Sequence, residues 1–338
     1  MTASNEVARM QVSIVIPVFN AEANLPELYR QLMPAMVALV ERFEVILVED
    51  SSSDRSWDVI RSLSAQDARV RGFRMSRNYG QHNALLCGIR AAQYGVIVTM
   101  DDDLQHPVSE ISLLLQAVAA GHDVVYGNSN DNQHDLWRNL ASRMTKLALQ
   151  GAMGAKSAAQ VSAFRAFPTR LRDAFRDYRS PSVSIDVLLT WATTRFTAVS
   201  VKHAPRLSGK SNYTVRKLIT HAFNLMTGFS TMPLQLASVV GFVFTLFGFG
   251  ILAWVLGRYF ISGTSVPGFP FLASVIAIFS GAQMFTLGII GEYLARMYGR
   301  TMERPAYVVL ESSEAPESQS GVTHEPAAFE RLTQRVGD

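Results

Sequence analysis

The residues with the clearest chemical potential are three consecutive carboxylates, Asp101, Asp102 and Asp103, which directly follow the apolar run 96–100. Adjacent carboxylates repel one another, so a cation that neutralises them stabilises the cluster, and hard oxygen ligands suit Mg²⁺ or Mn²⁺. Magnesium usually takes one or two protein carboxylates and completes its shell with substrate phosphates. The alternative is a solvated acidic turn before the next helix. The position directly after a buried strand favours a metal–phosphate site.

A second acidic cluster, Glu49–Asp54, follows another apolar run. The carboxylate of Asp50 is suited to accept a hydrogen bond from a nucleobase N–H or a ribose hydroxyl. Asp54 has instead the position of a helix cap, because the next helix begins just after it. The cluster therefore predicts one ligand-binding carboxylate and one capping carboxylate.

Two basic clusters are candidates for phosphate binding. Arg77–His82 places Arg, Gly and His where a helix begins, and helix N-termini bind anions. Arg206–Tyr213 combines Arg206, Lys210 and Ser211 just before the apolar part of the chain. Its cations can hold phosphate oxygens, or they can attract anionic lipid head groups. The residues alone leave both alternatives open.

The elements that must position these residues alternate between short β-branched strands and amphipathic helices. The expected strands are Val12–Val18, Phe43–Asp50, Val70–Met75, Val96–Asp101 and Asp123–Gly127. The expected helices are Leu25–Val40, Ser56–Ser64, Gln81–Gln93 and Val108–Ala120, with a further long helix near Trp137–Gly151. This alternation predicts an α/β fold with a mostly parallel sheet covered on both faces. Ligands of such sheets bind beyond the carboxyl ends of the strands, where Asp50 and the acidic triplet lie.

The C-terminal part contains two stretches without charged residues, 234–257 and 259–291. Each exceeds the roughly 20 residues that a helix needs to cross a bilayer, so we expect a transmembrane hairpin. Arg296, Arg300 and Arg304 follow the second stretch, while the connection offers only Arg258. This bias predicts that both termini are cytosolic. The first thirty residues show no secretory signal pattern, which agrees with that orientation.

Net charge and cysteine content exclude several classes of protein and site. The net charge is +3, from 31 Lys+Arg against 28 Asp+Glu, which does not provide the dense basic face of a nucleic-acid binder. A single cysteine, Cys87, excludes an intrachain disulfide framework and a thiolate zinc cluster.

Taken in order, the motifs resemble those of the polyprenyl-phosphate glycosyltransferases, family 2 enzymes with a GT-A fold that are related to dolichol-phosphate mannose synthase. The resemblance runs from about residue 11 to residue 310. It rests on Ser13–Asn20, Glu49–Asp54, Asp101–Gln105 and Arg206–Tyr213, followed by two spans. Further segments resemble the bacterial branch that includes the undecaprenyl-phosphate aminoarabinose transferase: Arg77–His82, Asp135–Met144, Gly281–Gln283, Gly291–Tyr293 and Arg304–Tyr307.

The resemblance implies an inverting transfer of a sugar from a nucleotide-sugar, by analogy UDP-linked, to a polyprenyl phosphate such as undecaprenyl phosphate. It implies a multi-pass enzyme of the cytoplasmic membrane that serves envelope glycan or lipid A/O-antigen modification, with Mg²⁺ or Mn²⁺ as cofactor and with a possible homo-oligomer. Its implied nucleotide-sugar ligands are Pro17, Asn20, Glu22, Asp50, Asp54, Arg77, Asp101 and Asp102. The metal would be held by Asp101, Asp103 and Gln105, and the acceptor phosphate by Arg138, Arg143, Arg206, Lys210 and Ser211, with Asp101, Asp103 and Arg206 as the catalytic residues.

The corresponding domain organisation divides the chain into seven parts. They are an N-terminal tail (1–10), a GT-A glycosyltransferase domain (11–215), an interfacial amphipathic helix (216–232), transmembrane helices (233–261 and 269–295), a juxtamembrane segment (296–311) and a disordered tail (312–338).

Three positions depart from the family pattern. Ala21 stands where a Glu is common, Asp102 where a small residue is common, and Ala163 where some members have an Asp proposed as a base. Two rival functions follow: an inactive membrane-anchored scaffold, which the alanines favour, and a processive polysaccharide synthase. Such synthases carry a Gln-x-x-Arg-Trp motif, and no Trp here follows an Arg. The absent Asp leads to the hypothesis that transfer needs no dedicated catalytic base.

Overall fold

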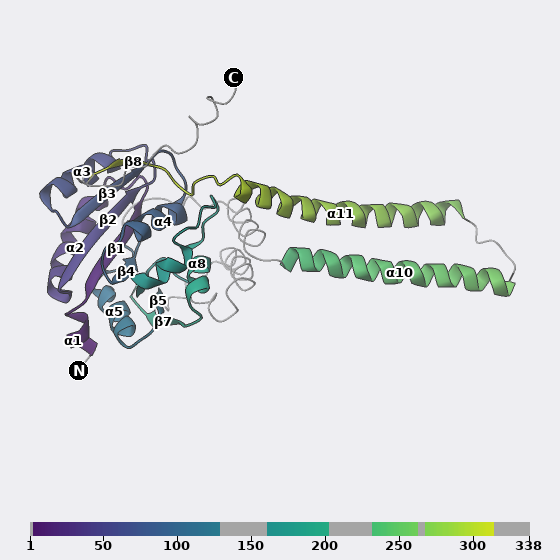
Figure 1. The fold of residues 1–338 in the computed structure, drawn as a ribbon, viewed down its shortest axis with the longest axis horizontal. Helices are drawn as coiled ribbons and strands as arrows, with labels where there is room; N and C mark the ends of the chain where they lie inside the picture. Colours follow the sequence, from purple (N-terminus) through teal and green to yellow (C-terminus); the bar gives the residue numbers. More distant parts are fainter. Residues whose placement is uncertain (1–2, 129–160, 203–231, 263–267, 314–338) are drawn as a thin grey trace, which may run out of the picture.

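The computed structural model describes residues 3–128, 161–202, 232–262 and 268–313. A sheet domain lies at one end of the molecule, and two long helices extend from it (Figure 1). Within the described residues the sheet has eight strands in the order β7-β5-β6-β4-β1-β2-β3-β8. The predicted transmembrane hairpin and the sheet domain are thus separate in space.

The centre of the sheet is parallel. The strands are β1 (Gln11–Val18), β2 (Arg42–Glu49), β3 (Val70–Met75), β4 (Val96–Thr99), β5 (Val124–Asn128), β6 (Arg165–Pro168), β7 (Phe196–Ser200) and β8 (Val309–Ser312). β1 pairs in parallel with β2 and β4, and β2 pairs in parallel with β3. β6 runs antiparallel between β4 and β5, whereas β8 pairs antiparallel with β3 at the edge. The carboxyl ends of β1, β2 and β4 therefore lie at the same edge.

Helices cover both faces of the sheet. They are α1 (Ala3–Val7), α2 (Leu25–Leu39), α3 (Ser56–Gln66), α4 (Gln81–Ala91), α5 (Ile111–Ala119) and α8 (Ile185–Ala192), with 3₁₀ turns at Val108–Glu110 and Thr169–Phe175. Alternating side chains of β1 separate the two layers, since Ile14 and Ile16 pack toward α2 and α5 while Val15 packs toward α4 and α8. Each strand of the centre thus buries both of its faces, as a parallel sheet requires.

The strands and helices predicted between residues 11 and 127 are confirmed, with ends that differ by at most three residues. The predicted helix Val108–Ala120 begins with the 3₁₀ turn Val108–Glu110, so α5 itself starts at Ile111, and β4 stops at Thr99, two residues before Asp101. The predicted helix near Trp137–Gly151 lies outside the described residues, and so does the predicted interfacial helix 216–232 except for Met232, which begins α10.

β8 was missed by the sequence analysis. The chain was predicted to be juxtamembrane up to residue 311 and disordered from Ser312, but Val309–Ser312 pairs with β3. All four residues of β8 are exposed, so the segment lacks the apolar alternation that predicts a strand. Its backbone pairing with β3 is a long-range contact that local pattern does not reveal.

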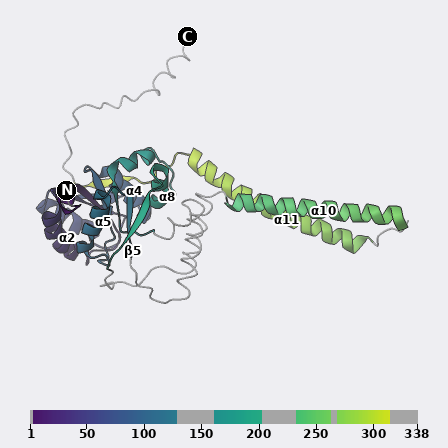
Figure 2. The same cartoon turned by 90° about the horizontal axis from the view of Figure 1, so that it is seen from below.

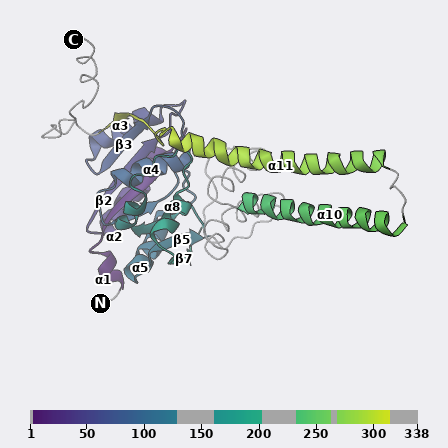
Figure 3. The same cartoon turned by 45° about the vertical axis from the view of Figure 1, so that its right-hand side comes forward.

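Two long helices, α10 (Met232–Ser262) and α11 (Phe269–Thr301), lie side by side (Figures 2 and 3). The rings of Phe244 and Phe279 meet edge to face with centroids 5.9 Å apart. Among the described residues, one helical stretch, Ala237–Arg258, is long and apolar enough to cross a membrane. α11 continues beyond the predicted end at residue 295, so its last turns extend toward the sheet domain.

Gly88 marks a close approach of α4 to the sheet and gives a test of this packing. A Cβ at Gly88 would overlap Val15 Cγ1 and would meet Val48 Cγ2 at 3.1 Å. We expect Gly88→Ala to lower the free energy of unfolding by about 1–3 kcal/mol, because overpacking outweighs the gain of about 1 kcal/mol in helix propensity. The measurement is urea unfolding of the full chain in detergent.

Gly95→Ala is the matched control, since nothing lies within 4 Å of its Cβ position. We expect that variant to stay within about 0.5 kcal/mol of the unsubstituted protein. Equal stabilities of the two variants would contradict the packing described for α4.

Candidate active site

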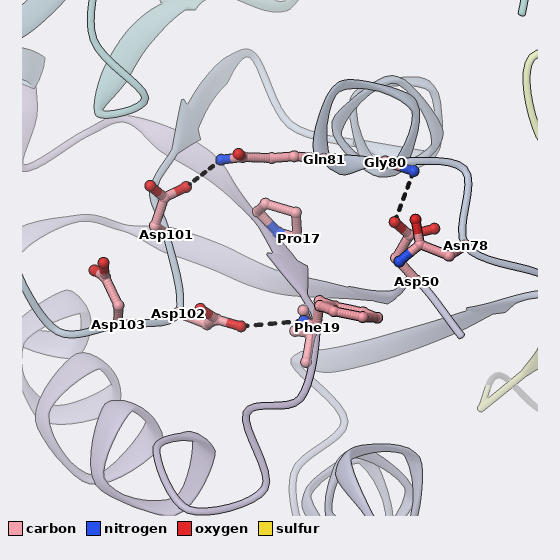
Figure 4. A pocket seen from close by; sticks show the side chains of 10 residues that line it. Pro17, Phe19, Asp50, Asn78, Gly80, Gln81, Asp101, Asp102 and Asp103 are labelled. Carbon is pink, nitrogen blue, oxygen red and sulfur yellow. Dashed lines mark hydrogen bonds between the residues drawn. The ribbon is translucent and has the colours of Figure 1, made fainter. Parts of the chain in front are cut away.

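A cavity of about 280 Å³ opens where the carboxyl ends of β1, β2 and β4 meet (Figure 4). The end of β1, the residue after β2, the entry to α4 and the loop after β4 all contribute to it. The lining residues are Pro17, Val18, Phe19, Asp50, Asn78, Gly80, Gln81, Asp101, Asp102 and Asp103. Four of the residues predicted to bind the nucleotide-sugar, Pro17, Asp50, Asp101 and Asp102, are thus brought together.

The acidic triplet is held by hydrogen bonds from two other segments and from its own loop. Asp101 Oδ1 accepts from Gln81 Nε2 at 2.6 Å, and Asp102 Oδ2 accepts from the backbone N–H of Phe19 at 3.2 Å. Asp103 Oδ1 accepts from the N–H of Gln105 at 3.1 Å. Leu104 between them has φ = 60°, a left-handed conformation that costs a non-glycine residue on the order of 1 kcal/mol. Burial of the Leu104 side chain offsets this cost.

The triplet concentrates negative charge in the cavity. Burial, the largest cause, and the neighbouring carboxylates of Asp101 and Asp103 together raise the pKa of Asp102 to about 7, while the hydrogen bond from the N–H of Phe19 opposes the shift. Like charges and desolvation both penalise the ionised form. A cation at this position would remove that penalty, so the electrostatics favour a positively charged ligand.

The residues present fit a divalent ion that is only partly held by protein. In the part of the chain that the structure describes, no group of three or more His, Cys, Asp or Glu residues is arranged to hold a metal ion. The predicted set, Asp101, Asp103 and Gln105, contains two carboxylates. That number matches the one or two carboxylates by which Mg²⁺ is usually bound, with substrate phosphates completing its shell. Hard oxygen ligands likewise suit Mn²⁺.

Asp50 shapes the opposite wall of the cavity (Figure 4). Its carboxylate is buried and accepts the N–H groups of Tyr79 at 2.7 Å and Gly80 at 2.8 Å. Burial raises its pKa, and these two backbone bonds oppose that effect. Gly80 has φ = 94°, which favours glycine at this turn. Asp50 therefore fixes the loop that enters α4 in addition to lining the cavity.

Three other predicted nucleotide-sugar ligands use their polar atoms to join two loops. Asn20 Oδ1 accepts the N–H of Ser53 at 2.9 Å, and Glu22 accepts the N–H and Nε–H of Arg55 at 3.1 and 3.0 Å. Asp54 accepts the N–H of Glu22 at 3.0 Å, and that of Ser56 at the same distance. These side chains form a brace between the loops after β1 and β2.

The remaining predicted residues divide into two groups. The Arg77 guanidinium lies over the Tyr79 ring, 4.5 Å from its centroid. The five predicted acceptor-phosphate residues lie outside the described residues: Arg138, Arg143, Arg206, Lys210 and Ser211. Conversely, Phe19, Asn78 and Gln81 line the cavity without having been predicted as ligands. Asn78 and Gln81 belong to the Arg77–His82 motif, whereas Phe19 offered no chemical signal.

Comparison with known proteins agrees with this geometry. Residues 13–179 match the model of Glycosyl transferase family 2. An undecaprenyl-phosphate 4-deoxy-4-formamido-L-arabinose transferase of Pseudomonas aeruginosa strain UCBPP-PA14 is 35% identical over 329 residues, which cover 96% of this chain and 94% of that enzyme. The enzyme of the same name from Serratia proteamaculans is 36% identical over 303 residues, covering 88% and 93%.

Among solved structures, the chain is similar to glucosyl-3-phosphoglycerate synthase from Mycobacterium tuberculosis in complex with Mn²⁺, UDP and phosphoglyceric acid. The sequence identity is 17% and the TM-score is 0.48, over 67% of this chain and 79% of that one. The full-length relatives are more informative, because their identity exceeds one third across nearly the whole chain. The chain therefore belongs to glycosyltransferase family 2, has the GT-A fold of that family, and is a glycosyltransferase similar over almost its entire length to the bacterial undecaprenyl-phosphate 4-deoxy-4-formamido-L-arabinose transferases.

Proposed function

We propose that this chain moves a sugar from a nucleotide-sugar, UDP-linked by analogy, to the phosphate of a polyprenyl phosphate such as undecaprenyl phosphate. The transfer inverts the anomeric centre, takes place on the cytoplasmic face of the membrane and serves envelope glycan or lipid A/O-antigen modification. The observation that carries the proposal is the acidic cavity at the carboxyl ends of β1, β2 and β4, in a chain that also contains a helical stretch, Ala237–Arg258, long and apolar enough to cross a membrane. The acceptor is supported by the relatives, which are undecaprenyl-phosphate 4-deoxy-4-formamido-L-arabinose transferases.

The donor site in this proposal is the cavity itself. Pro17 and Asp50 would face the nucleotide, while Asp101, Asp103 and Gln105 would hold Mg²⁺ or Mn²⁺ beside the diphosphate. When bound, the ion would neutralise the leaving nucleoside diphosphate. Gln81 orients Asp101, and Asp50 fixes the loop at Gly80, so the cavity is organised before a ligand enters.

The acceptor phosphate needs little help to become a nucleophile. A phosphate monoester has a second pKa near about 6 and is mostly dianionic at neutral pH. Its oxygen forms the bond to the anomeric carbon while the bond from that carbon to the diphosphate breaks, and no proton must be removed. A general base typically contributes about 10²–10⁴-fold when one is needed. Arg138, Arg143, Arg206, Lys210 and Ser211 are the residues we propose to position the phosphate.

The side chain of Ala163 is consistent with sugar transfer that uses no catalytic base from the enzyme. Ala163 lies beside the end of β4, where its carbonyl accepts the hydroxyl of Thr99 at 2.7 Å. Its methyl group cannot take up a proton. Positioning and charge neutralisation therefore carry the catalysis in this proposal.

The membrane part supplies the location of the acceptor. We propose that α10 and α11 form a two-span anchor with both termini in the cytosol, between a catalytic domain at 11–215 and the C-terminal segments. A polyprenyl tail is confined to the bilayer, so an anchored enzyme meets its acceptor at a raised effective concentration. In the alternative function, that of an inactive scaffold, the chain keeps the membrane anchor but does not catalyse sugar transfer.

Transfer to lipid tests the function directly. Purified full-length protein is mixed with undecaprenyl phosphate, Mg²⁺ or Mn²⁺, and a panel of labelled nucleotide-sugars. We expect label in the lipid fraction from one donor, and we expect its loss on chelation with recovery when the metal is restored. Hydrolysis or polymer formation without labelled lipid would overturn the assignment.

Asp103→Asn separates a catalyst from a scaffold. Loss of one carboxylate beside the diphosphate should lower the rate of transfer by about 10²–10³-fold, the size of effect seen when one group that stabilises a transition-state charge is removed. Asp58→Asn is the matched control, because Asp58 is an exposed carboxylate in an ion pair with Arg61 at 3.3 Å. It should retain full activity. Equal activities of the two variants would refute a catalytic role for the triplet.

The pH dependence tests transfer without a base. We expect kcat to rise as the acceptor phosphate ionises through about pH 6 and to be constant above about pH 7. The inflection belongs to the acceptor, so it should keep its position in the Asp102→Asn variant even where the rate itself is changed. An inflection that vanishes in this variant would assign the ionisation to the enzyme.

A further inference from the structure

The chain returns from the membrane helices to the sheet domain through residues 304–313, which we term the return segment. It runs from the end of α11 past α4 to β8 (Figures 1 and 3). The helix is closed by hydrogen bonds from Met302 N to Tyr298 O and from Glu303 N to Arg300 O, both 3.1 Å. Glu303 has φ = 48°, a left-handed turn that redirects the chain.

Beyond this turn the return segment is fastened to the edge of the sheet. Ser76 N donates to the carbonyl of Val308 at 2.9 Å, and Trp57 Nε1 donates to Glu311 at 2.8 Å. At the far end, Ser313 Oγ accepts the N–H of Gly72 at 2.7 Å. These contacts make the return segment part of the glycosyltransferase domain.

Asn83 links the return segment to the cavity. Its side chain is buried, and Nδ2 donates to the carbonyl of Ala306 at 2.5 Å and to that of Pro181 at 3.1 Å. Asn83 lies in the first turn of α4, where its own N–H donates to the carbonyl of Gly80 at 3.0 Å. The same turn carries Gly80 and Gln81, which line the cavity. The buried amide of Asn83 thus connects the wall of the cavity at Gly80 and Gln81 to the chain that follows α11.

The connection between the end of α11 and Ala306 is short. From Thr301 at the end of α11 to Ala306 the chain can span at most about 17 Å when fully extended. The turn at Glu303 shortens this reach. A shift of the helix end is therefore transmitted to Ala306 instead of being absorbed by slack chain.

We propose that Asn83 is a positioning residue that couples the end of α11 to the donor cavity. Its amide holds the first turn of α4 in the geometry that presents Gly80 and Gln81 to the ligand, and it does so only while the return segment is docked. This inference rests on the proposed function in one respect, namely that the cavity binds the nucleotide-sugar.

Asn83→Asp is the sharpest variant, because it preserves shape and replaces the donating NH₂ by an oxygen that faces two carbonyls. We expect the KM for the nucleotide-sugar to rise about tenfold while kcat changes less than about twofold, because the variant leaves a buried carbonyl without its donor. Ser313→Ala is the matched control in the same segment. It loosens the end far from α4, and the donor KM should stay unchanged.

Cys87 provides a readout that does not depend on activity. It is the only cysteine of the chain, it lies in α4 one turn after Asn83, and its buried thiol contacts Tyr307 of the return segment. Because the thiol is buried against Tyr307, and burial raises its pKa to about 12, we expect a thiol reagent to react faster when the return segment lifts. We expect Asn83→Asp to increase the rate of Cys87 labelling more than tenfold. Low concentrations of urea should leave this rate unchanged, because a rate that rises with urea would indicate global unfolding.

Coupling between two sites is reciprocal, so ligand in the cavity must hold the return segment down. In the unsubstituted protein, saturating UDP with Mg²⁺ should slow Cys87 labelling several-fold, and this measurement needs no variant to fold. UDP that binds by calorimetry without slowing the labelling would overturn the coupling while leaving the donor assignment intact. A failure of UDP to bind would overturn the donor assignment and this inference with it.

Equal effects of Asn83→Asp and Ser313→Ala on KM would also refute the role of Asn83.

Discussion

The repulsion among three adjacent carboxylates at the end of a buried strand is the constraint on which the site depends. Asp101, Asp102 and Asp103 share one small cavity, and burial already shifts Asp102 toward its neutral form. Besides a neutralising cation, contacts from other segments can hold such a cluster in place. Hydrogen bonds from Phe19 and Gln81, and a left-handed Leu104, do this here. The organised negative charge of the cavity favours a cation, as the proposed divalent ion beside a diphosphate requires.

The central fold could be predicted because its determinants are local. Each parallel strand is buried on both faces, so β-branched runs between amphipathic helices locate β1 to β5. β6 and α8 could not be found in this way. Arg165 in β6 is buried against Asp186 in α8, and its Nε donates to Thr99 Oγ1 at 3.1 Å. In the sequence, a buried charged residue cannot be distinguished from an exposed one until its ion-pair partner in another element is known.

The candidate site shows the same division between local and distant determinants. The acidic triplet is visible because its members are neighbours in sequence, and the fold adds Asp50 because parallel strands end together. Asn20 and Asp54 have the same residue types as ligands, but their hydrogen bonds brace two loops whose residues lie more than thirty positions apart. Residue type alone therefore does not reveal these contacts between the two loops. Phe19 contributes through its backbone, which no side-chain pattern reveals.

Transfer without a base changes what the rest of the structure must provide. If the acceptor phosphate is already ionised, the rate of the proposed transfer depends on how well donor and acceptor are held relative to one another, and the proposed polyprenyl acceptor would be held in the bilayer. A long, flexible tether between the membrane helices and the donor cavity would dilute that arrangement. The short connection from α11 to Ala306, closed on the buried amide of Asn83, removes this slack. In the proposed function, the edge strand β8 is thus the far end of the link between the proposed membrane anchor and the donor cavity.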